Sequence, residues 1–133
     1  MKRLLHLLLL LPLSTLLNSQ ESMKRDFIRA VQEADSYYYY YFDGDYEEAA
    51  VLYEPLYYSR PDNCNLAAKL GICYLKIDGR KKEALELLKK ASRNVVNYER
   101  EYIDYGEKAP FDTYLYLGIA YHMNDSLEKA ISV

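Results

Sequence analysis

The chain has 133 residues, which is enough for one domain or a short array of repeats. It carries 20 acidic and 17 basic residues with no basic face, which argues against a nucleic-acid partner. Five glycines and four prolines are few for a turn-rich all-β fold and favour helices. Two cysteines and two histidines are too few for a multi-ligand zinc site, so we expect neither a metal nor a cofactor.

Residues 1–19 have the layout of a secretory signal peptide. Two basic residues precede a leucine-dominated run of fourteen residues from Leu4 to Leu17. This run is too short for the ~20 apolar residues that cross a membrane. The small Ser19 suits the position before the cut, so we expect cleavage before Gln20 and an exported mature chain that does not span the membrane. A buried N-terminal helix is the alternative interpretation.

Three segments of the remaining chain align in one register, which is typical of a repeat array. The motif Leu-Gly-x-x-Tyr occurs in the second and third segments, beginning at Leu70 and Leu117. An alanine follows the tyrosine of each motif nine or ten residues later, and Tyr40 and Ala49 repeat this spacing in the first segment. Each segment is therefore predicted to form a helix–turn–helix hairpin.

These residues resemble the tetratricopeptide repeat, a helix–turn–helix unit of about 34 residues. The second unit matches most fully, at Leu70, Gly71, Tyr74, Gly79, Ala84, Leu88 and Ala91. The resemblance implies an all-α fold, a short right-handed solenoid in which each hairpin packs on the next. The expected organisation is a signal peptide at 1–19, a degenerate first repeat at 20–63, a second repeat at 64–96, an insertion at 97–110 and a truncated third repeat at 111–133.

The packing of the second unit is predicted from its small residues. Gly71 lies where the first helix meets the second, and without a side chain it lets the two backbones approach closely. Ala84 does the same from the second helix, so a bulky residue at either position would overpack the contact. Asp45 and Glu48 are expected to form an N-terminal capping box at the start of a helix in the first unit.

The insertion at 97–110 breaks the register, because Gly71 and Gly118 lie further apart than one repeat period. We expect the second helix of the preceding unit to continue through about Asp104, followed by a loop that ends at Pro110. The insertion forms either a contact arm for a partner or only a longer hairpin, and the sequence leaves both interpretations open.

Six successive aromatic residues at 37–42 are the strongest chemical signal in a chain with 16 tyrosines. On one helix such a run faces every direction, so some rings are exposed, and a tyrosine offers a partner both an apolar ring and a polar tip. The first helix of each tetratricopeptide hairpin lines a concave groove. The resemblance therefore implies a groove for a protein or peptide partner lined by Tyr38, Tyr41, Ile72, Leu75, Ile119 and His122, with Lys76 at its rim. The alternative is that helices outside this chain cover these aromatics.

No arrangement of catalytic residues stands out, so we do not expect an enzyme. His122 is the only histidine of the mature chain, and Ser126 is the only nucleophile candidate near it. Cys64 and Cys73 are nine residues apart on one predicted helix, about 13 Å along its axis at ~1.5 Å per residue. This separation is too large for a disulfide, and we expect two free thiols.

The segments NLAAKLGICYL and EKAPFDTYLYLGIAYHMN, with the signal ending in Ser-Gln, are similar to the N-terminal repeats of exported Bacteroidota envelope proteins. In that family, β-propeller-like repeats and an outer-membrane-protein-A-like domain follow the helices. The resemblance implies a non-catalytic interaction scaffold in the periplasm, associated with the outer membrane. The sensor part of a membrane-bound signalling protein is the alternative. The apolar stripe of the third repeat stops at Val133, which predicts self-association through this end.

The layout of residues 1–19 gives the first testable prediction. Intact-mass analysis of material from the periplasmic fraction is expected to show a chain that begins at Gln20. A cytoplasmic protein that retains Met1 would contradict both the export and the cleavage site.

Overall fold

The computed structural model describes residues 2–39, 44–99, 102–125 and 132. This part of the chain forms five α-helices: α1 (Lys2–Tyr38), α2 (Tyr46–Ser59), α3 (Cys64–Lys76), α4 (Lys81–Ala91) and α5 (Thr113–Met123). Within the same residues, β pairing is limited to one isolated bridge between Val95 and Ala109. The all-α fold class is therefore confirmed.

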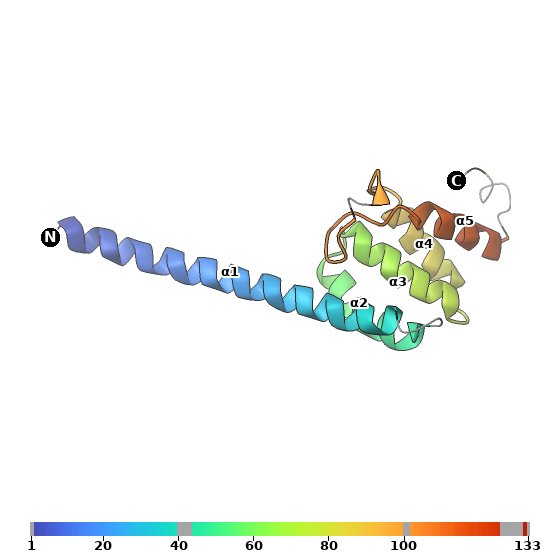
Figure 1. Ribbon diagram of the computed structural model, residues 1–133, viewed down its shortest axis with the longest axis horizontal. Helices are drawn as coiled ribbons and strands as arrows, with labels where there is room; N and C mark the ends of the chain where they lie inside the picture. The colour runs from blue at the N-terminus through green and yellow to red at the C-terminus, as the bar shows by residue number, and fades with distance from the viewer. Residues whose placement is uncertain (1, 40–43, 100–101, 126–131, 133) are drawn as a thin grey trace.

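The helices pack in chain order, each mainly against the one before it and the one after it. The N-terminal part of α1 extends away from the other helices, and its C-terminal part packs on α2 (Figure 1). Two helical hairpins result, α1 with α2 and α3 with α4, and α5 packs mainly on α4. The expected second helix of the third repeat falls largely on residues 126–131, which lie outside the described residues.

Short polar side chains begin two of these helices. The Asp45 carboxylate accepts a hydrogen bond from the Glu48 backbone N–H at 3.1 Å at the start of α2, so the predicted N-cap is confirmed. Asn63 caps α3 in the same way, with its side-chain oxygen 2.9 Å from the backbone nitrogen of Leu66. Along the described residues, no helix combines the length and the apolar character that crossing a bilayer requires.

Helix α3 is the centre of the core, because every one of its residues from Cys64 to Leu75 is buried. The predicted close approach at Gly71 is confirmed. A Cβ atom built on Gly71 would lie 2.9 Å from Cγ of Leu88 and 3.2 Å from Cβ of Leu87, both on α4. Ala84, also on α4, is fully buried. The backbones of α3 and α4 can approach this closely only because these positions carry small residues.

The predicted extension of α4 through Asp104 is wrong, because the helix ends at Ala91. After the helix, the backbone near Val96 forms hydrogen bonds with the backbone at Ala109 instead. The Val96 N–H donates to the Ala109 carbonyl at 3.0 Å, and the Ala109 N–H donates to the Asn94 carbonyl at 2.9 Å. These bonds bring the two ends of the insertion together, so the backbone groups at its ends find partners outside a helix.

The Gly71 contact gives a stability prediction. Gly71→Ala is expected to lower the free energy of unfolding by about 1–3 kcal/mol, since the new methyl group would overlap the Leu88 side chain. Lys76→Ala, at an exposed position of the same helix, is the matched control and is expected to change it by less than about 0.5 kcal/mol. Urea unfolding measures both, and equal stabilities of the two variants would show that the contact can relax.

Candidate functional site

A buried ion pair joins the first hairpin to the second. Lys69 of α3 is 2% exposed, and its Nζ lies 2.5 Å from Oδ1 of Asp35 on α1. The same carboxylate accepts a hydrogen bond from the hydroxyl of Tyr53 on α2. Lys69 also donates to the backbone carbonyl of Asp104 in the insertion at 3.0 Å. One buried cluster therefore connects three helices and the loop between α4 and α5.

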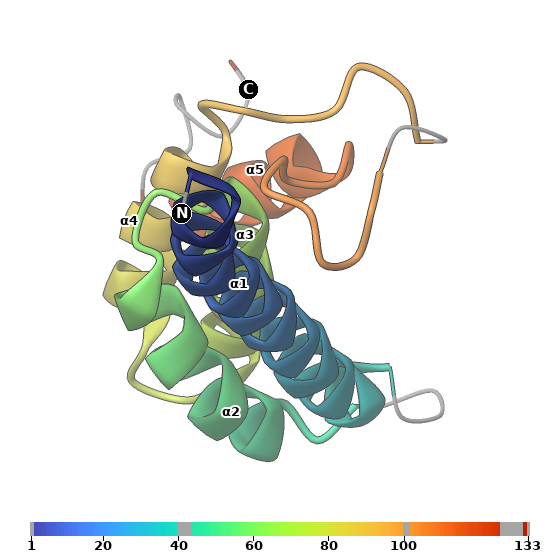
Figure 2. The ribbon, with the colours of Figure 1, turned by 90° about the vertical axis from the view of Figure 1, so that its left-hand side faces the viewer.

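Asn65, one helical turn before Lys69, anchors the insertion to α3. Its Nδ2 lies 2.8 Å from the carbonyl oxygen of Asp104 and 3.2 Å from those of Ile103 and Gly106. Its Oδ1 accepts a hydrogen bond from the Tyr102 hydroxyl at 2.9 Å. Figure 2 shows the loop on the side of α1, α3 and α5 that faces away from α2 and α4. The chain's own loop therefore covers part of the face that the sequence assigned to a groove.

Three of the predicted partner-binding residues belong to the interior. Ile72 and Leu75 are each 3% exposed and are members of the core, so little of either side chain is open to a partner. Tyr38 is half-buried and packs edge-on against Tyr46 and Tyr53, with ring centroids 5.9 and 6.2 Å apart. These three residues are buried or half-buried because the sides of α1 and α3 that carry them pack against the other helices.

The other predicted residues lie apart from that interior group. Lys76 is exposed at the end of α3, with its Nζ 5.8 Å from the Tyr46 ring centroid. Ile119 and His122 are exposed on α5, and Tyr41 lies outside the described residues. The partner-binding role of the whole set stays a prediction.

A pocket of about 380 Å³ lies where the end of α1, the insertion and the start of α5 meet. It is lined by Tyr39, Glu99, Tyr102, Pro110, Phe111 and Asp112. The side chains of Tyr39 and Phe111 are 59% and 57% exposed, so their rings are accessible to a ligand. We take this pocket, called the aromatic pocket below, as the candidate site.

None of the residues that line the aromatic pocket is among the partner-binding residues predicted from the sequence. Tyr39 belongs to the aromatic run at 37–42, whereas Tyr102 and Phe111 lie in or beside the insertion. The signal that could have found them is the density of tyrosines at 98, 102 and 105, which is unusual for a loop that only joins two helices.

The aromatic pocket is acidic. Desolvation raises the pKa of the Asp112 carboxyl, and the negative charge of Glu99 raises it further. Burial raises the pKa of the Tyr39 hydroxyl to about 12, and the charges of Asp104 and Asp35 contribute to this shift. The field at the pocket therefore favours positive charge and disfavours any additional negative charge.

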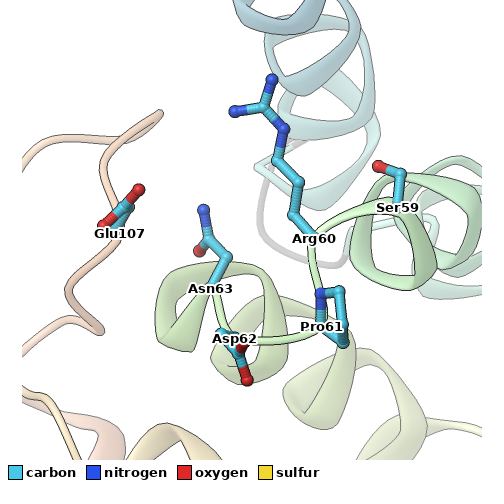
Figure 3. A pocket seen from close by; sticks show the side chains of 6 residues that line it. All are labelled: Ser59, Arg60, Pro61, Asp62, Asn63 and Glu107. Carbon is cyan, nitrogen blue, oxygen red and sulfur yellow. The ribbon is translucent and has the colours of Figure 1, made fainter.

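A second pocket, of about 430 Å³, lies at the turn between α2 and α3 (Figure 3). Residues 59–63 line it from the turn, and Glu107 faces them from the insertion. The Arg60 guanidinium lies 3.7 Å from the ring centroid of Phe27, and the Asn63 amide donates to the Gly106 carbonyl at 3.3 Å. Because these two side chains already hold the fold together, this pocket is the weaker candidate.

The described residues contain no group of three or more histidine, cysteine or acidic side chains arranged to hold a metal ion. No protein-family model matches the chain, and no curated protein and no solved structure matches it either. The function is therefore argued from the geometry and the charge of the site.

The buried ion pair gives a prediction about how the site is held together. Lys69→Met is expected to lower the free energy of unfolding by about 3–5 kcal/mol, because it leaves the buried Asp35 carboxylate without its cation. Adding Asp35→Asn removes that charge and is expected to restore part of the loss. Urea unfolding of both variants tests this, and a double variant less stable than Lys69→Met alone would contradict it.

Proposed function

We propose that the chain is a non-catalytic protein-interaction module of an exported bacterial envelope protein. Its helices form tetratricopeptide-like hairpins in a short right-handed solenoid, and a peptide or protein partner binds to them. The regular helix–turn–helix packing and the close contact at Gly71 support the repeat assignment, since both follow from the repeated motif in the sequence.

The observation that carries the proposal is the accessible aromatic surface around the aromatic pocket. Tyr39 and Phe111 expose more than half of their side chains there. Tyr114 and Leu115, at the start of α5, are 44% and 64% exposed and extend the apolar surface along the chain. Scattered exposed apolar residues are ordinary, but aromatic rings gathered at a pocket are typical of partner contacts.

The N-terminal part of α1 supports export. Every residue from Leu13 to Asp26 is exposed, and the core cluster begins with Val31, with Phe27 packed against it. Cleavage before Gln20 would therefore remove none of the core described here. Location in the periplasm, in association with the outer membrane, is proposed from the family resemblance of the sequence.

Site-specific photo-crosslinking tests the proposal. Tyr39 and Phe111 are each replaced by p-benzoylphenylalanine in cells that carry the native gene, and Val51, 61% exposed on α2, is the matched control. Both pocket positions are expected to give the same crosslinked protein, identified by mass spectrometry, and Val51 is expected not to give it. Absence of any adduct at the pocket, or the same adduct at all three positions, would contradict a partner surface here.

A further inference from the structure

The walls of the aromatic pocket are held in place before any ligand arrives. The Tyr102 hydroxyl is hydrogen-bonded to Asn65 on the buried helix α3, which fixes the ring from behind. Tyr39 follows the last residue of α1, and its ring packs edge-on against the Tyr38 ring, with centroids 4.8 Å apart. Phe111 comes just before α5. Three rings from three segments therefore surround one space, and the fold fixes two of them.

Two of the residues that line the pocket, Glu99 and Asp112, are acidic. Neither Glu99 nor Asp112 forms an ion pair with any residue that the structure describes. Lys69 lies 6.0 Å from the Tyr39 ring centroid, but its ammonium group is already paired with Asp35. None of the six lining residues is basic. Among the described residues, the pocket therefore combines aromatic faces with negative charge that no ion pair neutralises.

This combination selects for one chemical class of ligand. Ring faces attract cations, and the attraction grows when the cation loses water on entering the site. A neutral apolar group would desolvate the two carboxylates without satisfying them. An anion would be repelled by both. A volume of about 380 Å³ is near the lower end of the range of ligand pockets, about 300–1,000 Å³, which suits one long side chain.

We propose that the aromatic pocket binds a lysine or arginine side chain of the partner, presented on an extended peptide segment that continues over Tyr114 and Leu115. The carboxylates of Glu99 and Asp112 pair with its charge, and the rings of Tyr39, Tyr102 and Phe111 contact its stem and its charged head. This inference rests on the proposed function and names the chemistry of the partner.

A titration followed by NMR tests the cation site directly. The chain isolated from cells is titrated with N-acetyl-arginine amide, N-acetyl-lysine amide and the neutral isostere N-acetyl-citrulline amide. Saturable shifts of the backbone amides that line the pocket are expected with at least one charged compound. Citrulline amide is expected to bind at least fivefold more weakly than arginine amide. Equal binding of the charged and neutral compounds, or shifts located elsewhere, would overturn the proposal.

Conservative variants test the two acidic groups. Glu99→Gln and Asp112→Asn are each expected to weaken binding of the charged amides severalfold, and Asp78→Asn, at an exposed position in the turn between α3 and α4, is the control. Thermal unfolding of each variant shows whether the fold is kept. Binding that is unchanged in a folded Glu99→Gln, Asp112→Asn double variant would overturn the proposal.

The crosslinking experiment separates this inference from the function on which it rests. Suppose that Tyr39 and Phe111 crosslink a partner, and that the Glu99→Gln, Asp112→Asn double variant gives the same yield of crosslinked product. The chain then binds a protein, and the cation site is wrong. If the double variant lowers both the yield of crosslinked product and the binding of the charged amides, the result supports binding of a cationic side chain of the partner in the pocket. If charged amides bind but no partner crosslinks at either position, the proposed partner peptide is wrong.

Discussion

The buried pair of Lys69 and Asp35 is the interaction on which the described architecture depends. An ammonium group that is 2% exposed is tolerated only when a carboxylate and further polar groups surround it, and here Asp35 and the Asp104 carbonyl supply them. Tyr53 completes the coordination of the carboxylate. Because these groups come from α1, α2, α3 and the insertion, satisfying one charge fixes the relative position of four segments.

The described part of the insertion is held in place by the same requirement, applied to its backbone. Outside a helix, its carbonyl groups at 103, 104 and 106 need hydrogen-bond donors from water or from another part of the chain. The side-chain amide nitrogen of Asn65 lies within hydrogen-bond distance of all three. This anchoring determines which surface remains for a partner. Asn65 and Lys69 of α3 are buried where the loop binds them, whereas the ring of Tyr102 is held at the edge of the aromatic pocket by its bond to Asn65. A single asparagine therefore links the packing of the loop to the shape of the candidate site.

The parts of the fold that sequence could predict are those set by residues close together in the chain or by a repeated motif. Asp45 predicts the helix that begins at the next residue, because its carboxylate accepts the N–H of Glu48 three residues ahead, and the recurring Leu-Gly-x-x-Tyr motif predicts the close contact at Gly71. The path of the insertion depends instead on bonds between Asn65 and residues nearly forty positions later, which leave no local periodicity. For the same reason the aromatic run marked the segment that contains Tyr39 without singling out that residue, and Tyr102 comes close to it only through the folded loop.

The burial of the two cysteines determines how readily their thiols react. Both are free and buried, and burial raises the pKa of the Cys73 thiol to about 12. Thiol–disulfide exchange requires the thiolate, so an enclosed thiol with so high a pKa reacts slowly with oxidants or with a neighbouring chain. The Cys73 thiol therefore becomes accessible to oxidants when unfolding exposes α3.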